Sequence, residues 1–211
     1  VCAEYILNIK CRNSCKKNKE YTEMANKKSL ALTKEQYENI IGAMRMGGNT
    51  FRANDRIAAA LVLEANLGLR IGDILKLRLQ DIVLVGARYR LDIVEEKTQK
   101  KRVFTVPQPI YQYLRVYCMD HGIASGEVIF PVTERAVQKY LVKVTEELGY
   151  SSIGTHSFRK FFATEIYLNN NYNIVLVQQL LQHSSAAITQ RYIGISSKEI
   201  EDALAGHIEL L

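Results

Sequence analysis

The side chains of this sequence that could act together in catalysis are two arginines, two histidines, a lysine and a tyrosine. They are Arg70, Lys97, His156, Arg159, His183 and Tyr192. Cleavage of a phosphodiester requires neutralised non-bridging oxygens, an activated nucleophile and a proton for the leaving oxygen. Arginine presents a planar positive fork to phosphate oxygens, and histidine transfers protons near neutral pH. The set therefore indicates attack by a tyrosine on a DNA phosphodiester.

The arginines and one histidine lie where helices begin or are interrupted. Arg70 follows Gly68, which interrupts an apolar helix, and Arg159 lies one turn into a helix that begins near Thr155. Free N–H groups at a helix start favour an anion. His156 is three residues before Arg159, so both project from one helix face. A surface or capping pair remains the alternative for this His-x-x-Arg.

The other three candidates each have a structural alternative. Lys97 ends a strand before a hairpin turn, where a desolvated ammonium could donate a proton, or where it could simply be solvated. His183 follows an apolar helix and could donate to a phosphate or satisfy helix-end carbonyls. Tyr192 ends a short helix. Its phenol, with an ordinary pKa of about 10, needs nearby cations to act as a nucleophile, and otherwise it packs as an aromatic side chain.

The elements that must position these residues are mostly helical. In one region the spacing of apolar residues changes from that of a helix to that of β-strands. Apolar residues at helical spacing and helix caps predict an α+β fold dominated by helices. Three β-like runs predict a three-stranded antiparallel meander. The expected helices are 33–46, 56–67, a short one continuing to about Leu79, 110–117, 133–148, 156–169, 174–182, 185–193 and 196–211, and the expected strands are 82–85, 91–95 and 102–106.

The composition narrows the class of protein. The 211 residues are 47% hydrophobic and carry a net charge of +6, which fits a sizeable core and a nucleic-acid or anionic-membrane partner. No apolar run approaches the roughly 20 residues of a membrane span. The four cysteines have no zinc-site spacing, so we expect incidental thiols and a reducing, cytoplasmic compartment. Isolated acidic residues such as Asp73 and Glu64, and no Gly-rich phosphate loop, favour chemistry without metal or nucleotide cofactor.

The sequence suggests three segments. Residues 1–29 are rich in lysine and read as a basic linker, the remnant of an upstream domain. Residues 30–195 have the pattern of a globular catalytic domain. Residues 196–211 form an amphipathic helix with a capping box, suited either to docking on another subunit or to packing on its own domain.

Over residues 30–195 the chain resembles the tyrosine recombinase (phage integrase) family. Residues 67–77 resemble the family's first box, with Arg70 as its arginine and Asp73 as its supporting acid. Lys97 falls at the family's β-hairpin lysine, residues 156–159 resemble the His-x-x-Arg box, and residues 181–185 with Tyr192 resemble the final box. Gln182 departs from the glycine that commonly precedes the histidine, and we expect it to alter a local turn.

The resemblance implies a mechanism and a partner. Tyr192 would form a 3′-phosphotyrosyl bond and release a 5′-hydroxyl, without metal or ATP. Arg70, Arg159 and His183 would bind the phosphate, Lys97 would protonate the leaving oxygen, and His156 would assist. Double-stranded DNA would be bound by a homo-tetramer, or by a monomer for an isolated catalytic fragment that lacks a core-binding domain. The biological outcome would be integration or recombination of phage or mobile-element DNA.

Three other functions remain open from the sequence. A type IB topoisomerase uses similar chemistry and relaxes supercoils without a partner duplex. A DNA-binding protein with a decayed site would keep the fold and lose the reaction. A helical interaction module would carry the basic surface incidentally.

Overall fold

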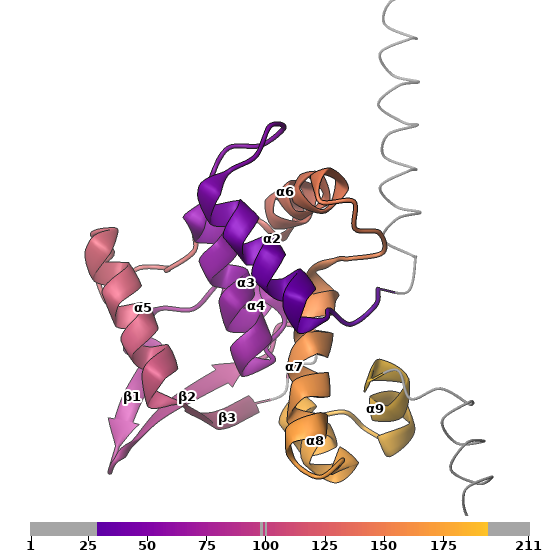
Figure 1. Ribbon diagram of the computed structural model, residues 1–211. Coiled ribbons are helices and arrows are strands. Elements are labelled where there is room, and N and C mark those ends of the chain that lie inside the picture. The colour runs from indigo at the N-terminus through magenta and orange to yellow at the C-terminus, as the bar shows by residue number, and fades with distance from the viewer. Residues whose placement is uncertain (1–28, 98, 100, 194–211) are drawn as a thin grey trace, which may run out of the picture.

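The fold is mainly helical and holds one small antiparallel sheet, as the sequence predicts (Figure 1). The computed structural model describes residues 29–97, 99 and 101–193. The expected basic linker therefore lies outside the described residues except for Ser29, and the expected C-terminal helix lies wholly outside them.

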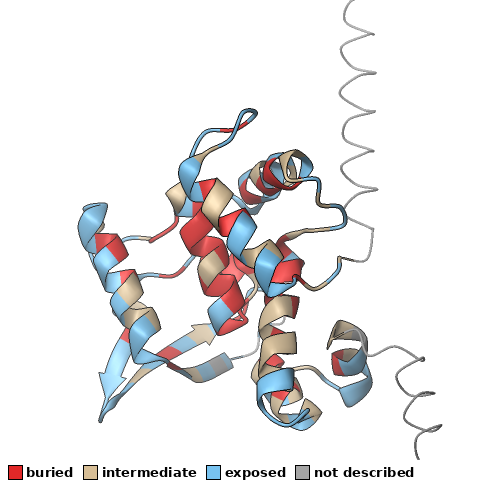
Figure 2. Ribbon diagram, in the orientation of Figure 1, coloured by how far each residue is buried: buried red, intermediate tan, exposed pale blue. Residues whose placement is uncertain are grey.

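Helix α3 (Asp55–Leu67) forms the centre of the core. Its alanines and leucines are buried, because α2 (Lys34–Met46), the short α4 (Ile71–Ile74) and α7 (Thr155–Asn169) all pack against it (Figure 2). The Thr33–Gln36 capping box predicted from the sequence begins α2. Because neighbours cover α3 on several sides, almost all of its residues can be apolar.

The sheet consists of β1 (Ile82–Val85), β2 (Arg88–Val94) and β3 (Lys101–Val106) in the order β1-β2-β3, and a 3₁₀ turn (Leu79–Asp81) precedes it. Both pairings are antiparallel, which confirms the predicted meander. Helix α5 (Gln108–Asp120) contacts β2, where the rings of Tyr89 and Tyr111 stack with centroids 3.8 Å apart. The hairpin between β2 and β3 carries Lys97.

The remaining helices are α6 (Glu134–Glu147), α8 (Ile174–Leu181) and α9 (Ala186–Ile193). Side-chain caps at Thr133 and Asn173 begin α6 and α8. Both α8 and α9 pack on α7, and Figure 1 shows α8 at the lower end of α7 and α9 on the side away from α5. A second small core of Ala163, Val177 and Leu181 joins α7 and α8, and the partly buried Tyr192 and Ile193 of α9 pack against it.

The prediction that the short helix runs to about Leu79 is wrong, because α4 ends at Ile74. The chain then becomes extended: the amide of Ile129 donates to the carbonyl of Leu77 at 2.9 Å, and Arg78 forms a bridge with Val128. Pairing with this distant segment replaces further helical hydrogen bonds. In the described part of the chain, none of the helices has the length and apolarity that crossing a bilayer demands.

Candidate active site

Arg159 lies near the centre of the site, on the first turns of α7, and its residue surface is only 2% exposed. Its Nη2 donates to the carbonyl of Leu181, the last residue of α8, at 3.1 Å. Its Nη1 is buried and makes no hydrogen bond of ordinary geometry within the described residues. One side of the guanidinium is therefore fixed, and the other keeps a donor that lacks a partner.

Arg70 is brought to the same site by the way α3 ends. Gly68 caps α3 with φ +59°, a left-handed conformation that favours glycine, and a Cβ there would lie 2.4 Å from the ring of Phe162 on α7. The chain then turns, and Arg70 precedes α4. Its guanidinium forms an ion pair with Glu95, whose side chain is 1% exposed.

Asp73, the expected supporting acid, contacts Arg70 through the backbone, because its amide donates to the carbonyl of Arg70 at 3.0 Å. One carboxylate oxygen, Oδ1, accepts from the amide of Glu96 at 2.9 Å, while Oδ2 is buried without a partner in the described structure. Within the described residues Asp73 forms no ion pair with Arg70. Asp73 instead holds the end of β2, and Glu95 is the carboxylate that contacts the arginine.

His183 lies directly after the α8 cap and faces the arginines. Burial lowers its pKa to about 4, with further lowering by the charges of Arg159 and Arg70 and an opposing effect of Glu95. Its Nδ1 is 3.1 Å from the hydroxyl of the fully buried Thr189. The ring is therefore neutral at pH 7 and oriented by a hydrogen bond, which leaves Nε2 to face a ligand.

His156 and Lys97 form the outer edge of the site. His156 is exposed, yet partial desolvation lowers its pKa, followed by the charges of Arg159, Lys97 and Arg70. Lys97 is also exposed, and its effect on the pKa of His156 places the hairpin close to the start of α7. The structure thus brings the lysine and the histidine to the same edge.

Tyr192, on the last turn of α9, lies beside His183 and Arg159. The rings of Tyr192 and His183 meet edge to face with centroids 5.0 Å apart, and Nζ of Lys160 lies 5.4 Å from the Tyr192 ring centroid. Burial raises the pKa of Tyr192 to about 12, while Arg159 opposes this by its charge and a weak hydrogen-bonding contact, and Arg70 opposes it by charge. The phenol is therefore neutral at pH 7.

Four residues of the site were missed by sequence reasoning or given no role in it. Glu64 is the one fully buried carboxylate of α3, and neither oxygen makes a hydrogen bond of ordinary geometry within the described residues. Burial raises its pKa well above the ordinary value, Arg159 and the N–H of Ile71 oppose this, and Glu134 adds to it. The others are Glu95, Thr189 and Lys160, whose Nζ donates to the carbonyl of Ser29.

Two of the four had a signal in the sequence. Glu64 is a lone charge in an otherwise apolar stretch, and Glu95 falls on the same side of its strand as Leu91 and Ile93, which indicates an inward position. Thr189 and Lys160 had none. No group of three or more His, Cys, Asp or Glu side chains suited to a metal ion occurs in the described ranges.

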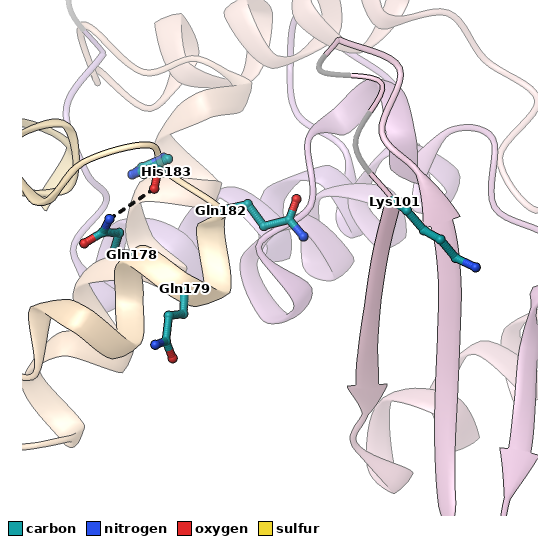
Figure 3. Close-up of a pocket in the computed structure, with 5 residues that line it drawn as sticks. All are labelled: Lys101, Gln178, Gln179, Gln182 and His183. Carbon is teal, nitrogen blue, oxygen red and sulfur yellow. Dashed lines mark hydrogen bonds between the residues drawn. The ribbon is translucent and has the colours of Figure 1, made fainter.

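An open cavity of about 510 Å³ lies beside His183. Its lining, drawn in Figure 3, comes from β3 on one side and from the end of α8 on the other: Lys101, Gln178, Gln179, Gln182 and His183. Gln182 caps α8 with φ 54° and ψ 37°, so it adopts the left-handed conformation that favours glycine. Glutamine thus stands in a turn conformation typical of glycine.

Comparisons with known proteins agree with this arrangement. The family model described as "Phage integrase family" matches residues 31–199. "Probable integrase/recombinase YoeC" of Bacillus subtilis is 32% identical over 149 residues, covering 67% of this chain and 79% of that protein. "Tyrosine recombinase XerC" of Nitrobacter winogradskyi is 31% identical over 156 residues, covering 70% of this chain and 48% of that protein.

A solved structure gives the same fold. The XerH site-specific recombinase bound to palindromic difH substrate superposes with a TM-score of 0.62 at 19% identity, covering 85% of this chain and 54% of that one. The chain spans only about half the length of XerC and XerH. The family model covers most of the chain and is joined by a relative above 30% identity, so the chain belongs to the phage integrase family.

Proposed function

We propose that this chain cleaves and rejoins double-stranded DNA through a covalent bond to Tyr192. The observation that carries the proposal is that the Tyr192 phenol, the neutral ring of His183 and the buried guanidinium of Arg159 meet in one half-buried place. A nucleophile, a neutral donor and a fixed positive charge are what phosphoryl transfer needs. The relatives' names give independent support, since they are recombinases and an integrase.

The arginines hold the scissile phosphate in this proposal. Nη1 of Arg159 donates to a non-bridging oxygen, while Nη2 keeps its hydrogen bond to Leu181. Arg70 donates to the other oxygen from its ion pair with Glu95. Nε2–H of His183 adds a third donor, which requires that the Thr189 hydroxyl donates to Nδ1 rather than to the carbonyl of Ser185, 3.4 Å away. Together these donors stabilise the charge that develops on the phosphate.

The bond changes balance without an outside energy source. Oη of Tyr192 bonds to phosphorus, the bond from phosphorus to the 5′-oxygen breaks, and a 3′-phosphotyrosine and a 5′-hydroxyl result. His156 accepts the phenolic proton, directly or through water, and Lys97 gives a proton to the leaving oxygen. One phosphodiester is exchanged for another, so attack by a 5′-hydroxyl from a partner duplex rejoins the strands and restores Tyr192.

The proposal includes strand exchange by a tetramer on two duplexes, in integration or recombination of phage or mobile-element DNA. It rests on family membership and on the resemblance of the sequence. Docking of residues 196–211 on a neighbouring subunit is part of the same proposal, and these residues lie outside the described structure.

A pool of nicked duplexes with a randomised core tests the chemistry. Cleavage beside the nick releases a short 5′-hydroxyl fragment and traps the covalent protein–DNA adduct, which denaturing gel electrophoresis detects in the presence of EDTA. The chain should form the adduct, and Tyr192→Phe should form none. Adding an intact duplex with the recovered core then separates strand transfer from the plain relaxation expected of a topoisomerase.

Tyr172→Phe is the matched control. Tyr172 lies in the turn before α8, is 65% exposed and contacts Tyr167 rather than the site. Its variant should form the adduct at the unmodified rate. An adduct that persists in Tyr192→Phe, with the same mass on its tryptic peptide, would exclude Tyr192 as the nucleophile.

A further inference from the structure

Gln182 occupies a backbone conformation that its side chain disfavours. Its φ of 54° and ψ of 37° lie in the left-handed region, where residues other than glycine are strained. A glycine would cap α8 there without this strain. Strain of this kind clusters at functional sites, where the side chain it retains has a use.

The side chain of Gln182 lines the cavity beside His183, and the oxygen of its amide has no partner within the described residues. Figure 3 shows its amide extending from the end of α8 toward the strand that carries Lys101. Its Oε1 is buried and has no hydrogen-bond partner within the described residues. Such an acceptor is destabilising until a donor reaches it. A ligand entering the cavity would supply that donor.

Two other residues that line the cavity already have partners. Gln178 is already engaged, because its Nε2 donates to the carbonyl of His183 at 3.2 Å. Lys101, from β3 on the other side of the cavity, is likewise engaged, in a 2.9 Å ion pair with Asp92. The amide of Gln182 carries no charge and adds little to backbone attraction. It instead offers a donor and an acceptor side by side.

We propose that Gln182 is a specificity-determining residue whose amide reads the edge of a base next to the scissile phosphate, with adenine preferred. A glutamine amide matches N6 and N7 of adenine through two hydrogen bonds. This inference rests on the proposed function, because His183, the next residue, positions the phosphate there. It differs from phosphate binding in that it concerns base choice and leaves the chemistry to other residues.

Gln182→Gly tests the inference, since it removes the amide and relieves the backbone together. The proteins compared are Tyr192→Phe and the double variant Tyr192→Phe, Gln182→Gly, so that binding is measured without cleavage. Duplexes selected from a randomised pool by each protein are sequenced. The protein with Gln182 should prefer adenine at one position beside the cleavage site by roughly tenfold, and the glycine variant should lose that preference. Its melting temperature should rise by about 2–4 °C.

Asn171→Gly is the matched control at the other end of α8. Asn171 has nearly the same φ, 53°, and is exposed before the helix. This variant should raise the melting temperature slightly and leave the base preference unchanged. An unchanged preference in Gln182→Gly, or no preference for adenine in the protein that retains Gln182, would overturn the inference. Because binding is measured without the nucleophile, failure of covalent cleavage would be recognised separately.

Discussion

The two arginines of the site are held in opposite ways. Arg70 lies on a loop at the edge of the site and is neutralised by an ion pair with the buried Glu95. Arg159 is anchored on a helix by a carbonyl. Glu95 and, more weakly, Glu64 act on it through their charges, and within the described residues the Glu64 oxygens complete no hydrogen bond of ordinary geometry. Arg70 is thus partnered before any ligand binds, whereas Arg159 retains an unused donor.

The difference indicates which of the two arginines should contribute more free energy to binding a phosphate. A phosphate at Arg70 must share the guanidinium with Glu95, so the net gain in free energy is small. A phosphate at Arg159 meets a buried donor that no carboxylate within the described residues engages, so less is given up when its hydrogen bond to the phosphate forms. We therefore expect Arg159 to contribute more to stabilising the transition state than Arg70.

Arg159→Lys should have the largest effect on cleavage. A lysine ammonium cannot hold the Leu181 carbonyl and a phosphate oxygen in the fork geometry of arginine. The single-turnover rate on a nicked duplex should fall roughly 100-fold or more. Arg45→Lys, on the exposed face of α2, is the control and should leave the rate unchanged. Equal losses in Arg70→Lys and Arg159→Lys would remove the distinction between the two arginines.

Glu95→Gln should have a smaller effect on cleavage and a clear effect on stability. It leaves the charge of Arg70 without its buried partner, and we expect a loss of about 2 kcal/mol, below the 3–5 kcal/mol of fully buried pairs because Arg70 is partly exposed. Cleavage should fall roughly tenfold as Arg70 loses its position. Urea unfolding and single-turnover kinetics measure the two effects.

Glu96→Gln is the adjacent control for Glu95. Its ion pair with Lys76 is solvent-exposed on both sides, so the change in stability should stay within about 0.5 kcal/mol. Comparable destabilisation by the two variants would mean that burial of Glu95 has no energetic consequence.

Glu64→Gln should change cleavage least, by less than about threefold, because glutamine keeps the shape of the neutral acid. Its effect should appear in the pH dependence of stability. The folded-state pKa of Glu64 is raised, so the wild-type chain loses stability as pH rises above the unfolded-state pKa, and glutamine does not. The variant should match wild type near pH 4 and melt at a higher temperature near pH 8. A melting difference independent of pH would show that Glu64 does not titrate in this way.

Much of the fold could be predicted because its signals are local. Helical spacing of apolar residues and helix caps predicted most of the helices. Runs of β-branched and aromatic residues predicted the meander in its observed order. The early end of α4 could not be predicted, since Leu77 and Arg78 pair with residues about 50 positions away. For the candidate site, the motif residues could be named, but partnerships such as Arg70 with Glu95 and His183 with Thr189 depend on how separate segments pack.

The raised pKa of Tyr192 has a consequence for the timing of the reaction. A pKa of about 12 means that about one molecule in 100,000 carries a phenolate at pH 7. A bound phosphate brings further negative charge, so substrate binding does not ionise the tyrosine beforehand. In the proposed reaction the proton would therefore leave as the bond to phosphorus forms. Without DNA the phenol of Tyr192 would then be a poor nucleophile toward other electrophiles.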